Sequence, residues 1–209
     1  MTTFQKDLQL AAAWLAEHDP ILAPIIALHG PPRFEPHSDY YAALVNSIIG
    51  QQLSVKAAST IKQRFQDLFD GQLPAPEAII SKSHDELRSV GLSNAKANYT
   101  RDLAEHVIDG RIKFDAIPQQ TNTEIIAKLT DVKGIGEWTV HMFLMFCVGR
   151  LDVLATGDLG VRNGIRNLYG LTVAPTPLQV SELAAQNGWH PYESVACWYL
   201  WRSLDNSPN

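Results

Sequence analysis

Apolar residues recur at the spacing of helices along most of this chain, and no segment alternates as a half-buried strand does. One helical face, in a segment that Ser38 can cap, is formed by Tyr41, Leu44, Val45, Ile48 and Ile49. Ser54 can cap the next helix, whose apolar face includes Ala57, Ile61, Phe65 and Leu68. The pattern predicts about ten helices joined by short connections, and therefore an all-α protein.

Capping signals mark where further helices begin. Three S/T-x-x-E/Q capping boxes occur: Ser83 with Glu86, Thr121 with Glu124, and Thr176 with Gln179. Pro177 falls at the first position of the last of these helices, and Gly188 is placed to end it. Pro191 is expected to open a final helix that carries Val195, Trp198, Tyr199 and Trp201.

Length and composition fit a globular, cytosolic-type protein. The 209 residues suit one domain, or two lobes that share a core, and 45% of them are hydrophobic. The N-terminal segment carries too many charges for a signal peptide, and the longest apolar run, residues 140–148, is too short to span a bilayer. Cys147 and Cys197 lie in apolar patterns typical of reduced core cysteines. The net charge of -5 is not that of a basic nucleic-acid-binding surface.

The segment DVKGIGEWTVHMF, residues 131–143, contains two closely spaced glycines, Gly134 and Gly136. A dinucleotide-binding loop needs a third glycine and a preceding strand, whereas here a capped amphipathic helix, TNTEIIAKLTDV, comes before the glycines. The sequence also lacks the P-loop pattern. The segment therefore predicts a helix, a tight Gly-x-Gly hairpin and a second helix.

Such a hairpin has features that suit a phosphate group. Gly134 and Gly136 allow a sharp turn that directs backbone N–H groups outward, and the following helix adds unpaired N–H donors at its start. Thr139, in the first turn of that helix, can add a hydroxyl. Backbone dipoles do not require a basic surface. A helical hairpin without any ligand is the alternative, and the glycines do not decide between the two.

Four segments together resemble the helix-hairpin-helix DNA glycosylases: NSIIGQQLSVKAA, GLSNAKANY, LTDVKGIGEWTV and LDVLATGDLGVRNG. The resemblance runs from about residue 39 to residue 201, and it is strongest to AlkA-like 3-methyladenine glycosylases in a short form without the N-terminal β-domain. It implies an all-α, two-lobed fold over a single domain, residues 1–209. One lobe would span about 36–150, including the hairpin at 124–148, and the other about 1–35 plus 151–209, with a cleft between them.

The resemblance places the catalytic aspartate at Asp158. An alkylated purine is already cationic and leaves readily, so the enzyme has mainly to stabilise the oxocarbenium-like sugar that remains. A fixed carboxylate does this and can also position the attacking water. The ordinary alternative is that Asp158 caps the helix from Leu159 to Leu168, a role compatible with catalysis. Asp152, in the same loop, is expected to be structural.

The resemblance also suggests residues that contact the base. Family members that cleave the strand carry a lysine where this chain has Trp138, and tryptophan cannot form a Schiff base. A monofunctional enzyme is therefore implied, with Trp138 as a wall of the base pocket that favours a cationic base, or alternatively as a core residue. Tyr192 and Trp189 are expected at the same pocket, although aromatic residues on a terminal helix are often core. Met142 stands where some relatives have an aromatic residue.

Further residues are expected to contact DNA. The turn in IIGQQLSVKAA would bring a wedge, Gln52 or Leu53, into the gap left by an extruded base, while Gln51 would bridge backbone groups. For Leu53 the alternative is a core position. Lys96 and Lys133, together with the hairpin, are the expected phosphate contacts, which fix register without reading sequence.

The implied function is hydrolysis of the N-glycosidic bond of alkylated purines, 3-methyladenine or 7-methylguanine, in duplex DNA during base excision repair. The alternatives are a glycosylase of this fold for another damaged or mismatched base, and a non-catalytic DNA-binding module. Two cysteines cannot ligate an iron–sulfur cluster, and no side-chain metal site or cofactor is expected, although backbone carbonyls of residues 131–136 could hold a cation. We expect a monomer, without a membrane partner, in the cytoplasm (the bacterial nucleoid) or the nucleus.

Overall fold

The structure, a computed structural model, describes residues 1–205. Within those residues the chain forms helices and no strand, which confirms the expected all-α class. The chain divides into two compact units. One unit is residues 38–143, and the other combines residues 1–37 with the chain from Leu144 onward. No helix of the described part is both long and apolar enough to cross a bilayer.

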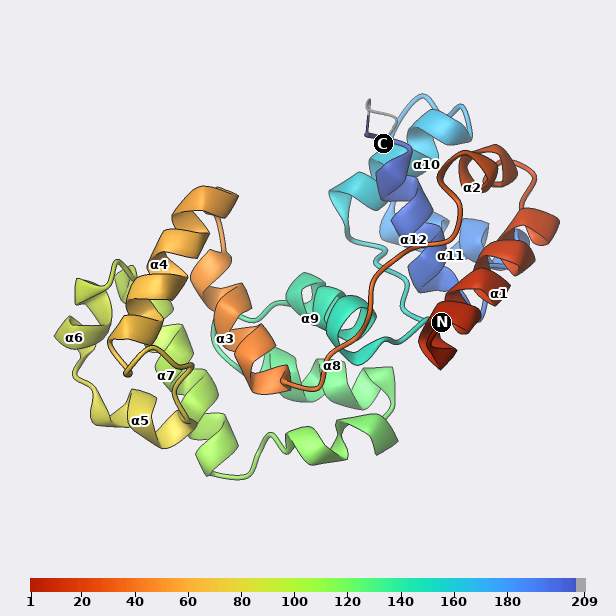
Figure 1. The fold of residues 1–209 in the computed structure, drawn as a ribbon. Helices are drawn as coiled ribbons and strands as arrows, with labels where there is room; N and C mark the ends of the chain where they lie inside the picture. The colour runs from red at the N-terminus through yellow and green to blue at the C-terminus, as the bar shows by residue number, and fades with distance from the viewer. Residues whose placement is uncertain (206–209) are drawn as a thin grey trace. The chain divides into compact units, whose positions relative to one another are not determined.

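The unit at 38–143 is built around one helix, α7 (Asn94–Ile108), which packs against α3, α5 and α6 (Figure 1). Ala97, Leu103 and Ala104 on α7 are fully buried. The predicted hairpin joins α8 to α9, which lie side by side. The other elements of this unit are α3 (Tyr40–Gly50), α4 (Val55–Asp67), α5 (Pro76–Ser81), α6 (His84–Ser89), the 3₁₀ helix η1 (Phe114–Gln119), α8 (Asn122–Thr130) and α9 (Glu137–Phe143).

The second unit is organised by the last helix, α12 (Glu193–Arg202), which packs against α1, α2 and α10 (Figure 1). Val195, Ala196, Tyr199 and Leu200 supply its buried face. Cys147 and Cys197 are buried thiols, and burial raises the pKa of Cys197 to about 12. The remaining elements are α1 (Thr3–His18), α2 (Ala23–His29), the π-helix η2 (Leu144–Val148), α10 (Leu159–Leu168) and α11 (Pro177–Gln186).

Most predicted helix starts are confirmed. Ser54 caps α4, and all three capping boxes form with both of their reciprocal bonds. The prediction for α3 was wrong by one residue, because the Asp39 carboxylate, not Ser38, accepts the N–H of Ala42 at 3.0 Å. The last helix begins at Glu193, later than Pro191 suggested.

A buried carboxylate fixes several segments of the second unit. Asp19 is fully buried, and its Oδ1 accepts the backbone N–H groups of Ile21 and Leu22, 2.9 and 3.1 Å away. Its Oδ2 accepts the hydroxyl of Tyr169 and, at 2.7 Å, the indole N–H of Trp189. A buried carboxylate is tolerated when hydrogen bonds replace the water that it has lost. Asp19 therefore fastens the α1–α2 turn to the end of α10 and to Trp189.

Candidate functional site

Asp158 is the N-cap of α10, and the helix that it caps runs from Leu159 to Leu168 as predicted. Its Oδ1 accepts the backbone N–H of Val161 at 2.7 Å and the indole N–H of Trp201 at 2.8 Å. Two donors on one oxygen, one from the first turn of α10 and one from α12, hold the carboxylate in one orientation. Asp158 is partly exposed, so the group is both fixed and accessible to solvent. Asp152, in the same loop, is exposed.

The bond between Trp201 and Asp158 depends on a glycine. A methyl group added at Gly160 would lie 2.7 Å from Cδ1 of Trp201 and 3.0 Å from Oδ1 of Asp158. Both separations are shorter than ordinary van der Waals contact, so a larger residue would push the indole away. Because Gly160 has no side chain, the indole of Trp201 on α12 fits beside it and donates to the Asp158 carboxylate.

The hairpin turns at Gly134, which has a φ of +82°. A methyl group there would lie 2.1 Å from Cδ2 of Tyr99, so the close approach of α7 also requires glycine. The Gly134 carbonyl oxygen accepts a hydrogen bond of 2.7 Å from Nε2 of Gln51. Gly136, by contrast, is exposed, and nothing lies within 4 Å of a methyl group built on it. The hairpin therefore has one side fixed by its neighbours and one side open.

The residues that follow the hairpin divide into exposed and buried positions. Trp138 is 54% exposed, so it is not the core tryptophan that was the alternative. Met142, one helical turn further along α9, is partly exposed. Thr139 is only 7% exposed, because it lies on the inner face of the helix next to Val140. Little of Thr139 reaches solvent, and the expected contact between its hydroxyl and a phosphate stays a prediction.

The turn between α3 and α4 has a strained residue at its tip. Gln52 has a φ of +57°, a left-handed conformation that is uncommon for any residue other than glycine, and its side chain is exposed. Leu53 is partly buried. Gln51 makes the expected contact with backbone, although the carbonyl that it reaches belongs to the hairpin and not to its own turn. The turn and the hairpin are thereby joined directly.

Lys96 binds the backbone of that turn, and its expected contact with a phosphate stays a prediction. Its Nζ donates to the carbonyl oxygens of Ile49 at 2.8 Å and of Gln51 at 2.7 Å. Burial lowers the pKa of this amine from its usual value. The ammonium group satisfies carbonyls at the end of α3 that have no partner within the helix, so Lys96 stabilises the turn.

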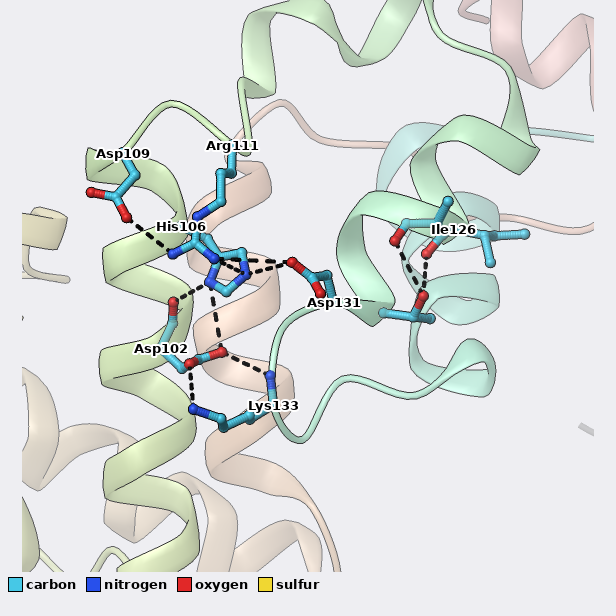
Figure 2. Close-up of polar contacts among 9 residues, drawn as sticks. Asp102, His106, Asp109, Arg111, Ile126, Asp131 and Lys133 are labelled. Carbon is cyan, nitrogen blue, oxygen red and sulfur yellow. Dashed lines mark hydrogen bonds and ion pairs between the residues drawn. The ribbon is translucent and has the colours of Figure 1, made fainter.

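The side chain of Lys133 is 74% exposed, yet it also forms an ion pair with Asp102. Its Nζ lies 3.2 Å from Oδ1 of Asp102, and its backbone N–H donates to Oδ2 of the same carboxylate at 2.8 Å (Figure 2). The side chain can still reach solvent.

The two aromatic residues expected from the C-terminal region differ in their surroundings. Trp189 is fully buried and donates its indole N–H to Asp19, so it is a core residue and does not line a pocket. Tyr192 is partly exposed, precedes α12 and packs edge-on against Trp14, with ring centroids 6.2 Å apart.

Three contributors to these sites were missed in the sequence. Trp201 was assigned only to the apolar face of the last helix, and Gly160 and Asp102 were not singled out. The available signal was weak, because each acts through a partner distant in the chain. Tyr99, Asp102 and His106 do fall on one face of a helix, but polar residues on a helix face ordinarily face solvent, so the pattern did not indicate the hairpin as their neighbour.

Comparisons with known proteins agree with one another. The family model described as "HhH-GPD superfamily base excision DNA repair protein" matches residues 45–189. DNA-3-methyladenine glycosylase 1 of Schizosaccharomyces pombe is 36% identical over 187 residues, covering 87% of this chain and 80% of that protein. The putative DNA-3-methyladenine glycosylase YfjP of Bacillus subtilis is 34% identical over 186 residues, which are 82% of this chain and 64% of the relative.

Solved structures show the same fold. The crystal structure of DNA-3-methyladenine glycosidase from Bacillus halodurans matches with a TM-score of 0.84 and 38% identity, covering 94% of this chain and 89% of that one. The Schizosaccharomyces pombe 3-methyladenine DNA glycosylase Mag1, in complex with abasic DNA, matches with a TM-score of 0.78 and 34% identity over 92% of this chain and 95% of Mag1.

Proposed function

Because this chain belongs to the HhH-GPD superfamily of base excision DNA repair proteins, we propose that it is a monofunctional DNA glycosylase for alkylated purines. It hydrolyses the N-glycosidic bond of 3-methyladenine and 7-methylguanine in duplex DNA and leaves an abasic site. The names of its relatives support this substrate class. The observation that carries the proposal is the Asp158 carboxylate, fixed by donors from two helices.

Asp158 acts on the sugar and not on the base. The leaving purine is cationic, so bond cleavage needs little acid catalysis, and the barrier lies in the positive charge that develops on the sugar ring. A carboxylate that is already oriented stabilises that charge without first having to reorganise. The same group accepts a proton from water as the bond to C1′ forms. The hydrogen bond by which Asp158 caps α10 thus also holds its carboxylate in the orientation that the reaction needs.

Trp138 determines the type of glycosylase. No amine stands at this position, so no covalent enzyme–DNA intermediate forms and the strand stays intact. Its exposed indole offers an electron-rich face to a cationic base. Tyr192 and Met142 remain proposed contacts of the base, with Met142 giving a softer and more adaptable surface than an aromatic residue would.

DNA is held by the hairpin and by the turn between α3 and α4. The exposed backbone around Gly136 and the side chain of Lys133 approach a phosphate, while Gln52, at the exposed tip of its turn, is the wedge and Leu53 is the alternative. These contacts are independent of sequence, as the repair of scattered lesions requires. We further propose that the enzyme acts as a monomer where chromosomal DNA lies.

Base release from methylated duplex DNA tests the proposal, with native protein compared with Asp158→Asn. Asparagine keeps an oxygen that can accept the N–H of Val161, so the cap survives while the charge is lost. We expect free methylpurine from the native protein and, on the scale typical of a lost charge-stabilising group, at least about tenfold less from the variant. Strands should stay intact until alkali is added, and borohydride should trap no protein–DNA adduct.

Other outcomes would favour the rival functions. DNA binding without release of any methylpurine would favour a binding module or a glycosylase for another lesion, which a panel of oxidised, deaminated and mismatched duplexes would separate. Undiminished release by Asp158→Asn would show that another group carries the reaction.

A further inference from the structure

One face of α7 points at the hairpin and is polar where a helix face against protein is usually apolar. Tyr99, Asp102 and His106 lie at helical spacing on that face. Tyr99 packs against Gly134, and the two polar residues reach the residues before the glycine, Asp131 and Lys133. Figure 2 shows the contacts of Asp102 and His106 on α7 with Lys133 and Asp131 in the first half of the hairpin.

Asp102 binds one residue of the hairpin twice. Its Oδ2 accepts the backbone N–H of Lys133 at 2.8 Å, and its Oδ1 lies 3.2 Å from the Nζ of the same residue. The side chain is only 12% exposed. Burial alone would raise the pKa of this carboxyl, but the two hydrogen bonds and the charge from Lys133, together with His106, outweigh burial and lower it. The contacts with Lys133 therefore favour the charged, carboxylate form of Asp102.

His106 fixes the start of the hairpin in a second way. It is 3% exposed; its Nδ1 donates to the backbone oxygen of Asp102 at 2.7 Å, and its Nε2 faces Nη1 of Arg111 at 2.8 Å and Oδ2 of Asp131 at 3.1 Å. A carbonyl oxygen can only accept, so Nδ1 carries a proton, while Nε2 lies between the Arg111 guanidinium group and the Asp131 carboxylate. Arg111 also lies 3.9 Å from the Asp131 carboxylate.

We propose that Asp102 is a positioning residue for the glycosylase reaction, which holds Lys133, and through it the hairpin, in the conformation that binds DNA phosphate. The proposal rests on the proposed function. Asp102 cannot favour DNA by its charge, because a carboxylate beside a phosphate-binding loop repels phosphate. Its value lies in the order that it imposes, since a preformed loop does not lose conformational entropy when DNA binds.

The direction of the effect separates positioning from simple electrostatics. If charge alone mattered, removing Asp102 would free Lys133 for phosphate and tighten DNA binding, with a steeper dependence of affinity on salt. If Asp102 positions the hairpin, removing it weakens binding even though the surface becomes more positive. Asp109 provides a matched control, because it carries the same charge at the end of α7, is exposed, and pairs with Arg111 at 3.0 Å without touching the hairpin.

The experiment compares Asp102→Ala, Asp102→Asn and Asp109→Asn with the native protein, after thermal melts have established that each variant is folded. Affinity for a duplex that contains an abasic site is measured by fluorescence anisotropy over a range of salt, and kcat and KM for methylated duplex are measured in parallel.

We expect Asp102→Ala to raise Kd and KM roughly fivefold or more while kcat stays within about twofold, in line with the loss of a charge-assisted hydrogen bond. Asp102→Asn should recover part of the loss, because its amide oxygen still accepts the N–H of Lys133. Asp109→Asn should bind as well as the native protein or slightly better.

Two results would overturn the proposal. Asp102→Ala binding DNA as tightly as Asp109→Asn would mean that the hairpin keeps its conformation without Asp102. A fall in kcat at unchanged KM would place the effect in the reaction step instead. A native protein that binds DNA but releases no methylpurine would contradict the proposed function, and the Kd values of the variants would still decide the role of Asp102 in binding.

Discussion

Replacing Trp201 with phenylalanine removes the donor that α12 supplies to Asp158. The indole N–H lies 2.8 Å from Oδ1 of Asp158, and phenylalanine has no group that can replace it. The N–H of Val161 remains on the same oxygen at 2.7 Å, so Asp158 still caps α10. The variant therefore loosens the orientation of Asp158 without removing the group.

The size of the effect follows from the hydrogen bond that is lost. A hydrogen bond to a charged group contributes about 1.5–3 kcal/mol, which corresponds to roughly 10- to 150-fold in rate if all of it is realised in the transition state. Because one donor remains on the oxygen, we expect the lower end, about a tenfold fall in kcat. KM should be nearly unchanged, since Trp201 is not among the proposed DNA contacts. The smaller ring also leaves a gap beside Phe146, which should cost about 1–2 kcal/mol of stability.

Single-turnover release of methylpurine, measured at a temperature well below the melting point of the variant, isolates the reaction step. Trp198→Phe is the matched control, because Trp198 is on the same helix and stacks with Arg202 but makes no contact with Asp158. A loss of less than about twofold in Trp201→Phe would refute the reasoning that orientation by Trp201 matters. A loss equal to that of Asp158→Asn would also refute it, because it would mean that the carboxylate had been displaced altogether.

Two further predictions concern stability. Gly134→Ala should lower the free energy of unfolding by about 1–3 kcal/mol or more in urea, because of its positive φ and the ring of Tyr99 2.1 Å from the new methyl, whereas Gly136→Ala should be nearly neutral. Burial lowers the pKa of His141 in spite of the nearby Glu137, so the unfolded chain binds more protons than the folded one as pH falls below about 6.5. The native protein should therefore lose stability over that range, and His141→Gln should flatten the dependence in melts from pH 7.5 to 5; an unchanged slope would place the titrating group elsewhere.

Features set by residues close together in the chain could be predicted from the sequence. The all-α helix-hairpin-helix fold is confirmed, and so are the capping boxes and the boundaries of α10. A cap and the N–H that it accepts are three residues apart, so the pattern itself contains both partners. Ser38 is not the cap because α3 begins at Tyr40, which puts Asp39, an equally good capping residue, at the N-cap position.

Roles that depend on distant partners could not be predicted. Lys96 was expected to contact phosphate because it lies in GLSNAKANY, a segment that resembles the glycosylase family, but the pattern did not predict that it binds carbonyls more than forty residues earlier. Trp189 was expected at a pocket, but its indole N–H donates a hydrogen bond to the buried Asp19, 170 residues away. In both cases the residue type is compatible with either role, and only tertiary packing decides which polar group lies opposite.

The net charge of -5 argued against a DNA-binding protein. It is compatible with the proposed binding of phosphate by the hairpin once the partners of the nearby acidic residues are considered. Two carboxylates stand beside the first half of the hairpin: Asp102 lies 3.2 Å from Nζ of Lys133, and Asp131 faces the guanidinium group of Arg111 and the ring of His106. Charges compensated at such short range contribute little to the field that an approaching phosphate meets, because screening by water and salt leaves only the local remainder. These two carboxylates therefore serve the geometry of the loop, and in the proposed binding mode the attraction of DNA is left to the exposed backbone and to the cations around it. If the hairpin binds phosphate as proposed, the overall charge of the chain is a poor guide to that function, whereas the partners of the acidic residues next to the hairpin are a good one.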